Sequence, residues 1–113
     1  MTPQGSAPSA EADVLTIVRT GLDAGRVVRV GADDWTSIAQ AFPEVERHAT
    51  GVAGDLLIVG TGAGLAAVER PTDQERVIRP LGDAAAARAF VDERLAQYER
   101  MWEGCGCRID YDA

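Results

Sequence analysis

The segment 56-LLIVGTGAGLAAVERPTDQERVIR-79 contains three short apolar runs separated by two turn-forming stretches. The runs lie at residues 56–59, 65–69 and 76–79. Short apolar runs of this kind are typical of strands, and glycine-rich or Pro-Thr-Asp-Gln stretches are typical of turns. Connections this short join antiparallel neighbours. The segment therefore predicts a three-strand antiparallel meander.

Helical patterns precede the meander. Apolar residues recur at helical spacing over residues 10–24, and a short strand is predicted over residues 26–30. Asp33 or Asp34 can cap a second helix. Proline is favoured at a first helical position, so Pro43 predicts a further helical turn that runs to about residue 49.

A long helix is predicted after the meander. Asp83 is its cap, residues 84–103 carry an apolar stripe at helical spacing, and Gly104 ends it. Residues 107–111 can add a short strand at a sheet edge. The predicted fold is α+β: a small antiparallel sheet, built of the meander and edge strands, packed by the long C-terminal helix in the order α-β-α-β-β-β-α-(β).

The length of 113 residues indicates one domain. We expect a single α+β domain over residues 9–113, preceded by a disordered tail over residues 1–8. That tail lacks the basic and apolar regions of a signal peptide. No apolar run approaches the roughly 18 to 20 residues that span a bilayer, so we expect a soluble, cytoplasmic protein.

The charge of the chain indicates which classes of partner it can bind. The formal net charge is −7, and all eleven basic residues are arginine. Nucleic acids and anionic lipid surfaces are bound through clusters of basic residues, so we expect neither a nucleic-acid nor a membrane partner. The absence of lysine and asparagine from the sequence excludes a Schiff-base lysine, a P-loop lysine and an asparagine-assisted triad.

The glycine loop at Gly60, Gly62 and Gly64 resembles the start of a dinucleotide-binding Rossmann domain, in which glycines after an apolar strand cradle a pyrophosphate. The spacing is G-x-G-x-G instead of G-x-G-x-x-G, and Pro71 would cut the following helix short. Two other interpretations are a glycine-rich hairpin and a loop that approaches another chain's backbone. Nucleotide binding at residues 60–64 is a minor alternative.

The only two cysteines, Cys105 and Cys107, lie one residue apart after the predicted helix. Such a pair can chelate zinc or another thiophilic metal. A closed zinc site needs four ligands, so His48, a nearby carboxylate or a second pair from a symmetry mate would have to complete it. The negative end of the helix favours a bound cation over a thiolate.

The alternative chemistry is thiol redox. A Cys-Gly-Cys disulfide closes a very small ring, and strained disulfides are oxidising. A third interpretation is that both cysteines only fill a tight turn.

No recognisable set of acid, base and nucleophile is present in the sequence. We therefore expect a non-catalytic accessory or assembly domain that forms a homo-oligomer or binds a protein partner, with a metal held by the cysteine pair. Trp35, Tyr98 and Trp102 could anchor such an interface. The alternative is a small thiol-disulfide oxidoreductase that uses the same cysteines.

Overall fold

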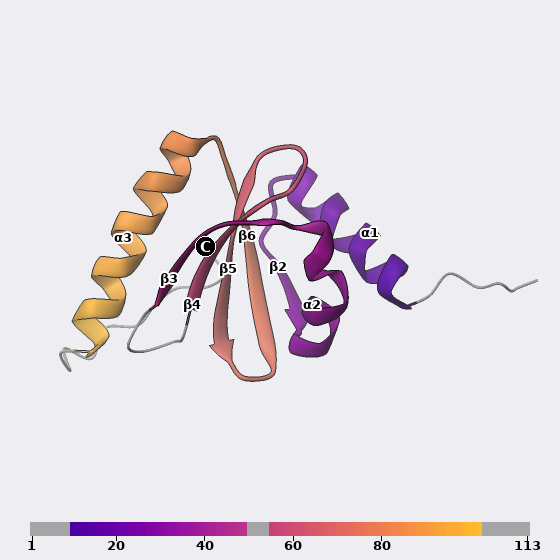
Figure 1. Ribbon diagram of the computed structural model, residues 1–113, viewed down its shortest axis with the longest axis horizontal. Coiled ribbons are helices and arrows are strands. Elements are labelled where there is room, and N and C mark those ends of the chain that lie inside the picture. Colours follow the sequence, from indigo (N-terminus) through magenta and orange to yellow (C-terminus); the bar gives the residue numbers. More distant parts are fainter. Residues whose placement is uncertain (1–9, 50–54, 103–113) are drawn as a thin grey trace, which may run out of the picture.

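The computed structural model describes residues 10–49 and 55–102 (Figure 1). Three α-helices, a short 3₁₀ turn and five strands make up this part of the chain. In chain order they are α1 (Ala10–Asp23), β2 (Val28–Gly31), α2 (Ala32–Ile38), the 3₁₀ turn (Ala39–Ala41), β3 (Glu44–Ala49), β4 (Asp55–Gly60), β5 (Leu65–Thr72), β6 (Glu75–Gly82) and α3 (Ala84–Trp102). The predicted α+β class and the packing of the long helix on the sheet are confirmed.

The five strands form one antiparallel sheet in the order β2-β6-β5-β4-β3. The predicted meander is β4, β5 and β6, and β3 extends it by one strand at one edge. β2 pairs with β6 and forms the other edge. The edge strand predicted over residues 26–30 is therefore present as β2, whereas the opposite edge is formed by β3, which was not predicted as a strand.

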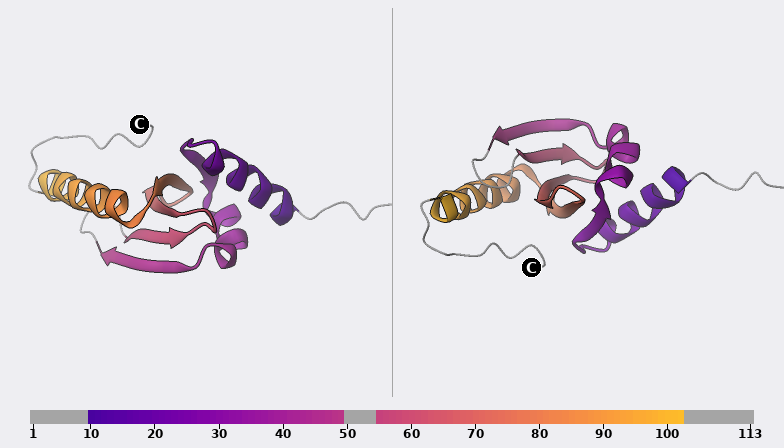
Figure 2. Two further views of the ribbon diagram at one scale, coloured as in Figure 1. Left: turned by 90° about the horizontal axis from the view of Figure 1, so that it is seen from above. Right: turned by 90° about the horizontal axis from the view of Figure 1, so that it is seen from below.

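Helices cover both faces of the sheet, with α3 on one side and α1 and α2 on the other (Figure 2). α3 packs on β5 and β6, whereas α1 and α2 pack mainly on β6 and β2. Asp83 caps α3 as predicted, because its Oδ1 accepts a hydrogen bond of 2.9 Å from the amide of Ala86.

The alternation of strand side chains divides the core between the two faces. On the side of α1 and α2, the buried residues are Val18, Leu22, Trp35, Ile38, Phe42, Val59, Ala66, Val68 and Ile78. On the side of α3 they are Leu56, Ile58, Ala67, Val91 and Tyr98. Since consecutive residues of β4 and β5 enter opposite cores, these strands appear in the sequence as continuous apolar runs.

The helical turn predicted over residues 43–49 is wrong, because this segment is strand β3. Phe42, which precedes Pro43, has φ −127° and ψ 80°, outside the helical region, as is usual before proline. Backbone pairing with the buried strand β4 then overrides the helix propensity of a segment rich in glutamate, arginine and alanine. The strand includes a bulge between Glu44 and Glu46.

Two predictions fall on other parts of the chain. The tail over residues 1–8 and the edge strand over residues 107–111 both lie outside the described residues.

Candidate functional site

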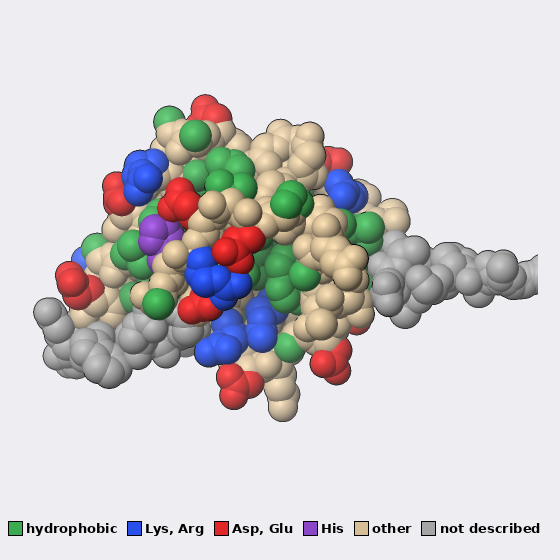
Figure 3. Space-filling model, viewed as in Figure 1, with side chains coloured by type: hydrophobic (Ala, Val, Ile, Leu, Met, Phe, Trp, Pro, Cys, Tyr) green, Lys and Arg blue, Asp and Glu red, His purple; other side chains and the backbone are tan. Residues whose placement is uncertain are grey.

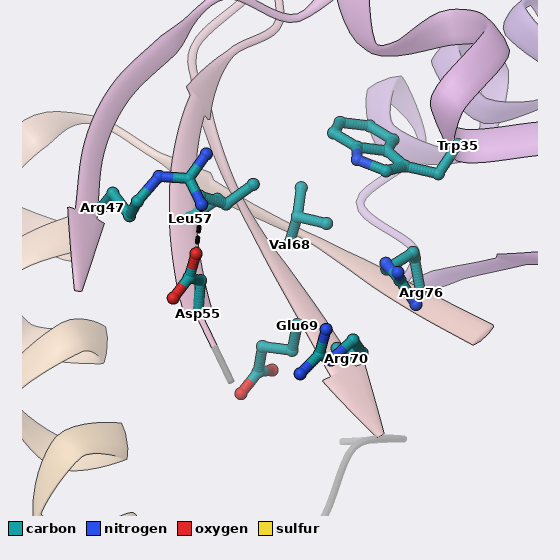
Figure 4. A pocket seen from close by; sticks show the side chains of 8 residues that line it. All are labelled: Trp35, Arg47, Asp55, Leu57, Val68, Glu69, Arg70 and Arg76. Atoms are coloured by element: carbon teal, nitrogen blue, oxygen red, sulfur yellow. Dashed lines mark hydrogen bonds and ion pairs between the residues drawn. The ribbon is translucent and has the colours of Figure 1, made fainter. Parts of the chain in front are cut away.

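A recess opens on the face of the sheet that α1 and α2 cover only in part (Figures 3 and 4). Its volume is about 300 Å³. Side chains from α2 and from strands β3 to β6 converge there, and they are Trp35, Arg47, Asp55, Leu57, Val68, Glu69, Arg70 and Arg76. We call this surface the arginine-lined recess. Figure 3 shows arginine side chains gathered on this face beside apolar surface.

The floor of the recess is apolar. Leu57 of β4 and Val68 of β5 are directly opposite each other across the two strands. Trp35 of α2 forms one wall, and its ring stacks on that of Phe42 with 5.8 Å between the ring centroids. Because the core holds Trp35 from behind, the wall of the recess is preformed.

One of the three arginines is already neutralised by carboxylates. Arg47 donates a hydrogen bond of 2.7 Å to Glu44 Oε1 and a second one to Asp55 Oδ2. The bond to Glu44, and then that to Asp55, raises the pKa of Arg47 above its ordinary value. The three side chains are exposed or half-exposed, so their ion pairs contribute little to stability.

The other two arginines lie side by side. Glu69 is opposite Val77, and the next position along each strand holds Arg70 and Arg76. Arg76 donates from Nη1 to the backbone carbonyl oxygens of Thr72, at 3.2 Å, and Glu75, at 2.7 Å. These bonds orient the guanidinium group, and no carboxylate in the described part of the chain forms an ion pair with it. Within residues 10–49 and 55–102, no hydrogen bond or ion pair engages the exposed Arg70 side chain.

Glu69 borders the recess but turns its carboxylate toward α3. Its Oε2 accepts a hydrogen bond of 2.7 Å from the hydroxyl of Tyr98 and lies 2.8 Å from Nε of Arg94. All three residues are buried. Burial raises the pKa of Glu69, although the Tyr98 hydrogen bond and the charges of Arg94 and Arg79 oppose that effect.

Two further contacts complete this buried network. The guanidinium carbons of Arg94 and Arg79 lie 4.9 and 5.6 Å from the ring centroid of Phe90. Glu69 Oε1 has no hydrogen-bond partner among the described residues. The network joins α3 to β5 and β6, and so holds the strands that carry Arg70 and Arg76.

The glycine loop belongs to the hairpin between β4 and β5. Gly62 has φ +91°, and a Cβ on Gly64 would lie only 2.9 Å from the carbonyl oxygen of Gly82. The chain continues from the loop into strand β5, so no helix N-terminus is there to hold a pyrophosphate. The hairpin interpretation of Gly60, Gly62 and Gly64 is confirmed, and the close approach is to a backbone of the same chain.

The remaining predicted site residues are not brought together by the described structure. His48 lies on strand β3 instead of a helix, and its Nε2 is 2.6 Å from Glu46 Oε2. Cys105 and Cys107 lie outside the described residues, so metal binding and thiol chemistry stay predictions. Over the described ranges, no group of three or more His, Cys, Asp or Glu side chains is placed to hold a metal ion.

Arg70 and Arg76 were not predicted as site residues. One signal was present: they flank the predicted turn over residues 71–74, and pairing the two strands across that turn brings them together. Trp35 was identified only as an interface anchor. Its position beside the recess depends on how α2 packs on the sheet.

Comparisons with known proteins give no assignment: no family model, curated protein or solved structure matches the chain significantly. None of the helices in the described part of the chain has the length and apolar character needed to cross a membrane. The functional conclusion therefore rests on the recess itself.

Proposed function

We propose that this chain is a non-catalytic accessory domain that binds a protein partner in the arginine-lined recess. The observation that carries the proposal is the recess itself, in which half-buried Leu57 lies over the buried side chains of Val68 and Trp35 and is bordered by arginines. Protein interfaces combine an apolar centre with a polar rim, and tryptophan and arginine are enriched among the residues that dominate binding energy.

The size of the recess also favours this function. A volume of about 300 Å³ is at the lower end of the range for small-molecule pockets. It can accommodate one or two side chains of a partner. The wall at Trp35 is already in place, so binding requires little ordering of the domain.

Two further parts of the proposal concern the whole chain. We propose that Cys105 and Cys107 of two copies together hold a zinc ion or another thiophilic metal, which would make the domain a homo-oligomer. We also propose a cytoplasmic location, where such cysteines stay reduced or bind metal.

The binding proposal can be tested by selecting peptides from a random display library against the full chain. The bound peptides are then mapped with ¹H–¹⁵N NMR spectra of the labelled protein. We expect the largest shift changes at Leu57, Val68 and the Trp35 indole. Ile17→Ser removes an apolar side chain that is 65% exposed on α1, away from the recess, and serves as the control that should leave binding unchanged.

Shift changes centred on Ile17, or the failure of any peptide to bind, would contradict the proposal. If the recess signals shift with protein concentration in the absence of peptide, the partner that occupies the recess is a second copy of the chain. Analytical ultracentrifugation of the same samples identifies this case.

A further inference from the structure

The position of Arg70 and Arg76 is unfavourable for the domain alone. Arg70 of β5 and Arg76 of β6 both line the arginine-lined recess, next to a shift of register between Glu69 and Thr72. Two like charges held near each other on neighbouring strands repel. A pair of this kind beside an apolar recess indicates a site that an anion would complete.

The carboxylates that line the recess do not relieve this repulsion. Asp55 is bonded to Arg47, and Glu69 is bonded to Tyr98 and Arg94 on the opposite face of the sheet. Glu75, which follows the turn, pairs with Arg29 at 3.5 Å. These three carboxylates are thus engaged elsewhere, and Asp73 in the exposed turn between the two strands forms no ion pair with either arginine among the described residues.

We infer that Arg70 and Arg76 together bind a carboxylate of the partner. This inference rests on the proposed function and specifies the chemistry of the partner. The guanidinium group has a planar fork of donors that matches a carboxylate, and hydrogen bonds between charged groups are the strong ones. The backbone carbonyls that hold Arg76 Nη1 orient that guanidinium before the partner arrives.

The surroundings of the pair define the rest of the recognised segment. Half-buried Leu57, backed by the largely buried Val68 and Trp35, offers an apolar surface next to the two arginines (Figure 4). The partner segment therefore carries an Asp or Glu side chain next to a large apolar one. A nucleic-acid strand fits less well, because the negative net charge of the domain repels a chain of phosphates.

The test uses two synthetic peptides with blocked ends, one that contains Glu-Glu-Phe and one that contains Gln-Gln-Phe at the same place. Binding to the full chain is followed by the shifts of Leu57 and Val68 and of the arginine Nε–H groups. Arg70→Gln removes one charge of the pair. Arg88→Gln, which removes the same charge from an exposed position on α3, is the matched control.

We expect the Glu-Glu-Phe peptide to bind in the recess at least about tenfold more tightly than the Gln-Gln-Phe peptide. Arg70→Gln should remove this preference and Arg88→Gln should retain it. A higher salt concentration should weaken the binding of the Glu-Glu-Phe peptide but not that of the Gln-Gln-Phe peptide. Since Arg70 makes no bond with the described residues, its substitution leaves the fold intact.

Three outcomes would overturn the inference. If both peptides bind the recess equally well, the arginine pair does not bind a carboxylate. The same conclusion follows if Arg70→Gln and Arg88→Gln change the affinity for the acidic peptide equally. In both cases the proposed function stands. If neither peptide shifts the recess at millimolar concentration, both proposals fail. If a single-stranded oligonucleotide binds the pair more tightly than the acidic peptide, the occupant is not a protein segment.

Discussion

Tyr98→Phe is the most informative single change to the buried network behind the recess. The variant removes only the hydroxyl that donates to Glu69 Oε2 at 2.7 Å. Tyr98 is 4% exposed and Glu69 is 1% exposed, so water cannot replace the lost donor. A hydrogen bond to a charged group contributes about 1.5–3 kcal/mol, and we expect a loss of that size in the free energy of unfolding at pH 7.

The loss should be measurable by urea and thermal unfolding followed by circular dichroism. For a domain of this size, it corresponds to a decrease in Tm of roughly 6–12 °C. The same Tyr98→Phe change made in a Glu69→Gln protein is the matched control, because the neutral amide of glutamine accepts a weaker hydrogen bond than a carboxylate does. In that background, Tyr98→Phe should cost only about 0.5–1.5 kcal/mol.

The pH dependence of the same variant has a definite sign. Burial raises the folded-state pKa of Glu69, so its contribution to stability is greatest below the unfolded pKa and is lost as the pH rises through the folded pKa. The Tyr98 hydrogen bond lowers that folded pKa, and Tyr98→Phe therefore raises it further. The cost of the substitution should grow from acidic to neutral pH. A cost below about 0.5 kcal/mol at pH 7, or one that does not change with pH, would refute this account of the network.

Three other changes test separate parts of the structure. Arg94→Met should lower the free energy of unfolding by about 3–5 kcal/mol, because it leaves the Glu69 carboxylate buried without its ion-pair partner. Adding Glu69→Leu should recover part of that loss in urea unfolding, and an Arg94→Met variant as stable as the unsubstituted protein would contradict the prediction. Gly64→Ala should lower the free energy of unfolding by about 1–3 kcal/mol, since the added Cβ would lie 2.9 Å from Gly82 O. Gly60→Ala should lower it clearly less, because its Cβ would lie 3.8 Å from Pro43 Cγ, and equal losses would argue against the close approach at Gly64. Elemental analysis should find one zinc per two chains, lost in Cys105→Ser and Cys107→Ser, and a metal-free protein with a reversible, oxidising disulfide would instead favour the oxidoreductase alternative.

Local sequence signals predicted most of the fold. The turns at residues 60–64 and 71–74 separate the strands of the meander, and the cap at Asp83 marks the start of α3. These features depend on neighbours in the sequence, through turn residues and hydrophobic spacing. Strand β3 was wrongly predicted as a helical turn from its local sequence. Its conformation is determined by pairing with the buried strand β4, which local signals do not show.

The site was harder to predict for the same physical reason. Arg70 and Arg76 have the pattern of solvated strand residues, and only the folded sheet shows that both line one recess. Trp35 is a core residue, and its second role as a wall of the recess depends on how α2 packs. The cysteine pair was conspicuous by chemistry alone, but it lies outside the described residues. Chemically reactive groups attract attention in a sequence, whereas a binding surface exists only after the chain folds.

The most direct test of the central claim is a search for NOEs between a bound peptide and the recess. Using the complex of the full chain with the Glu-Glu-Phe peptide, we expect contacts from the phenylalanine ring to the methyl groups of Leu57 and Val68 and to the indole of Trp35. Contacts confined to other surfaces, such as the one around Ile17, would contradict the claim that the arginine-lined recess binds a protein partner.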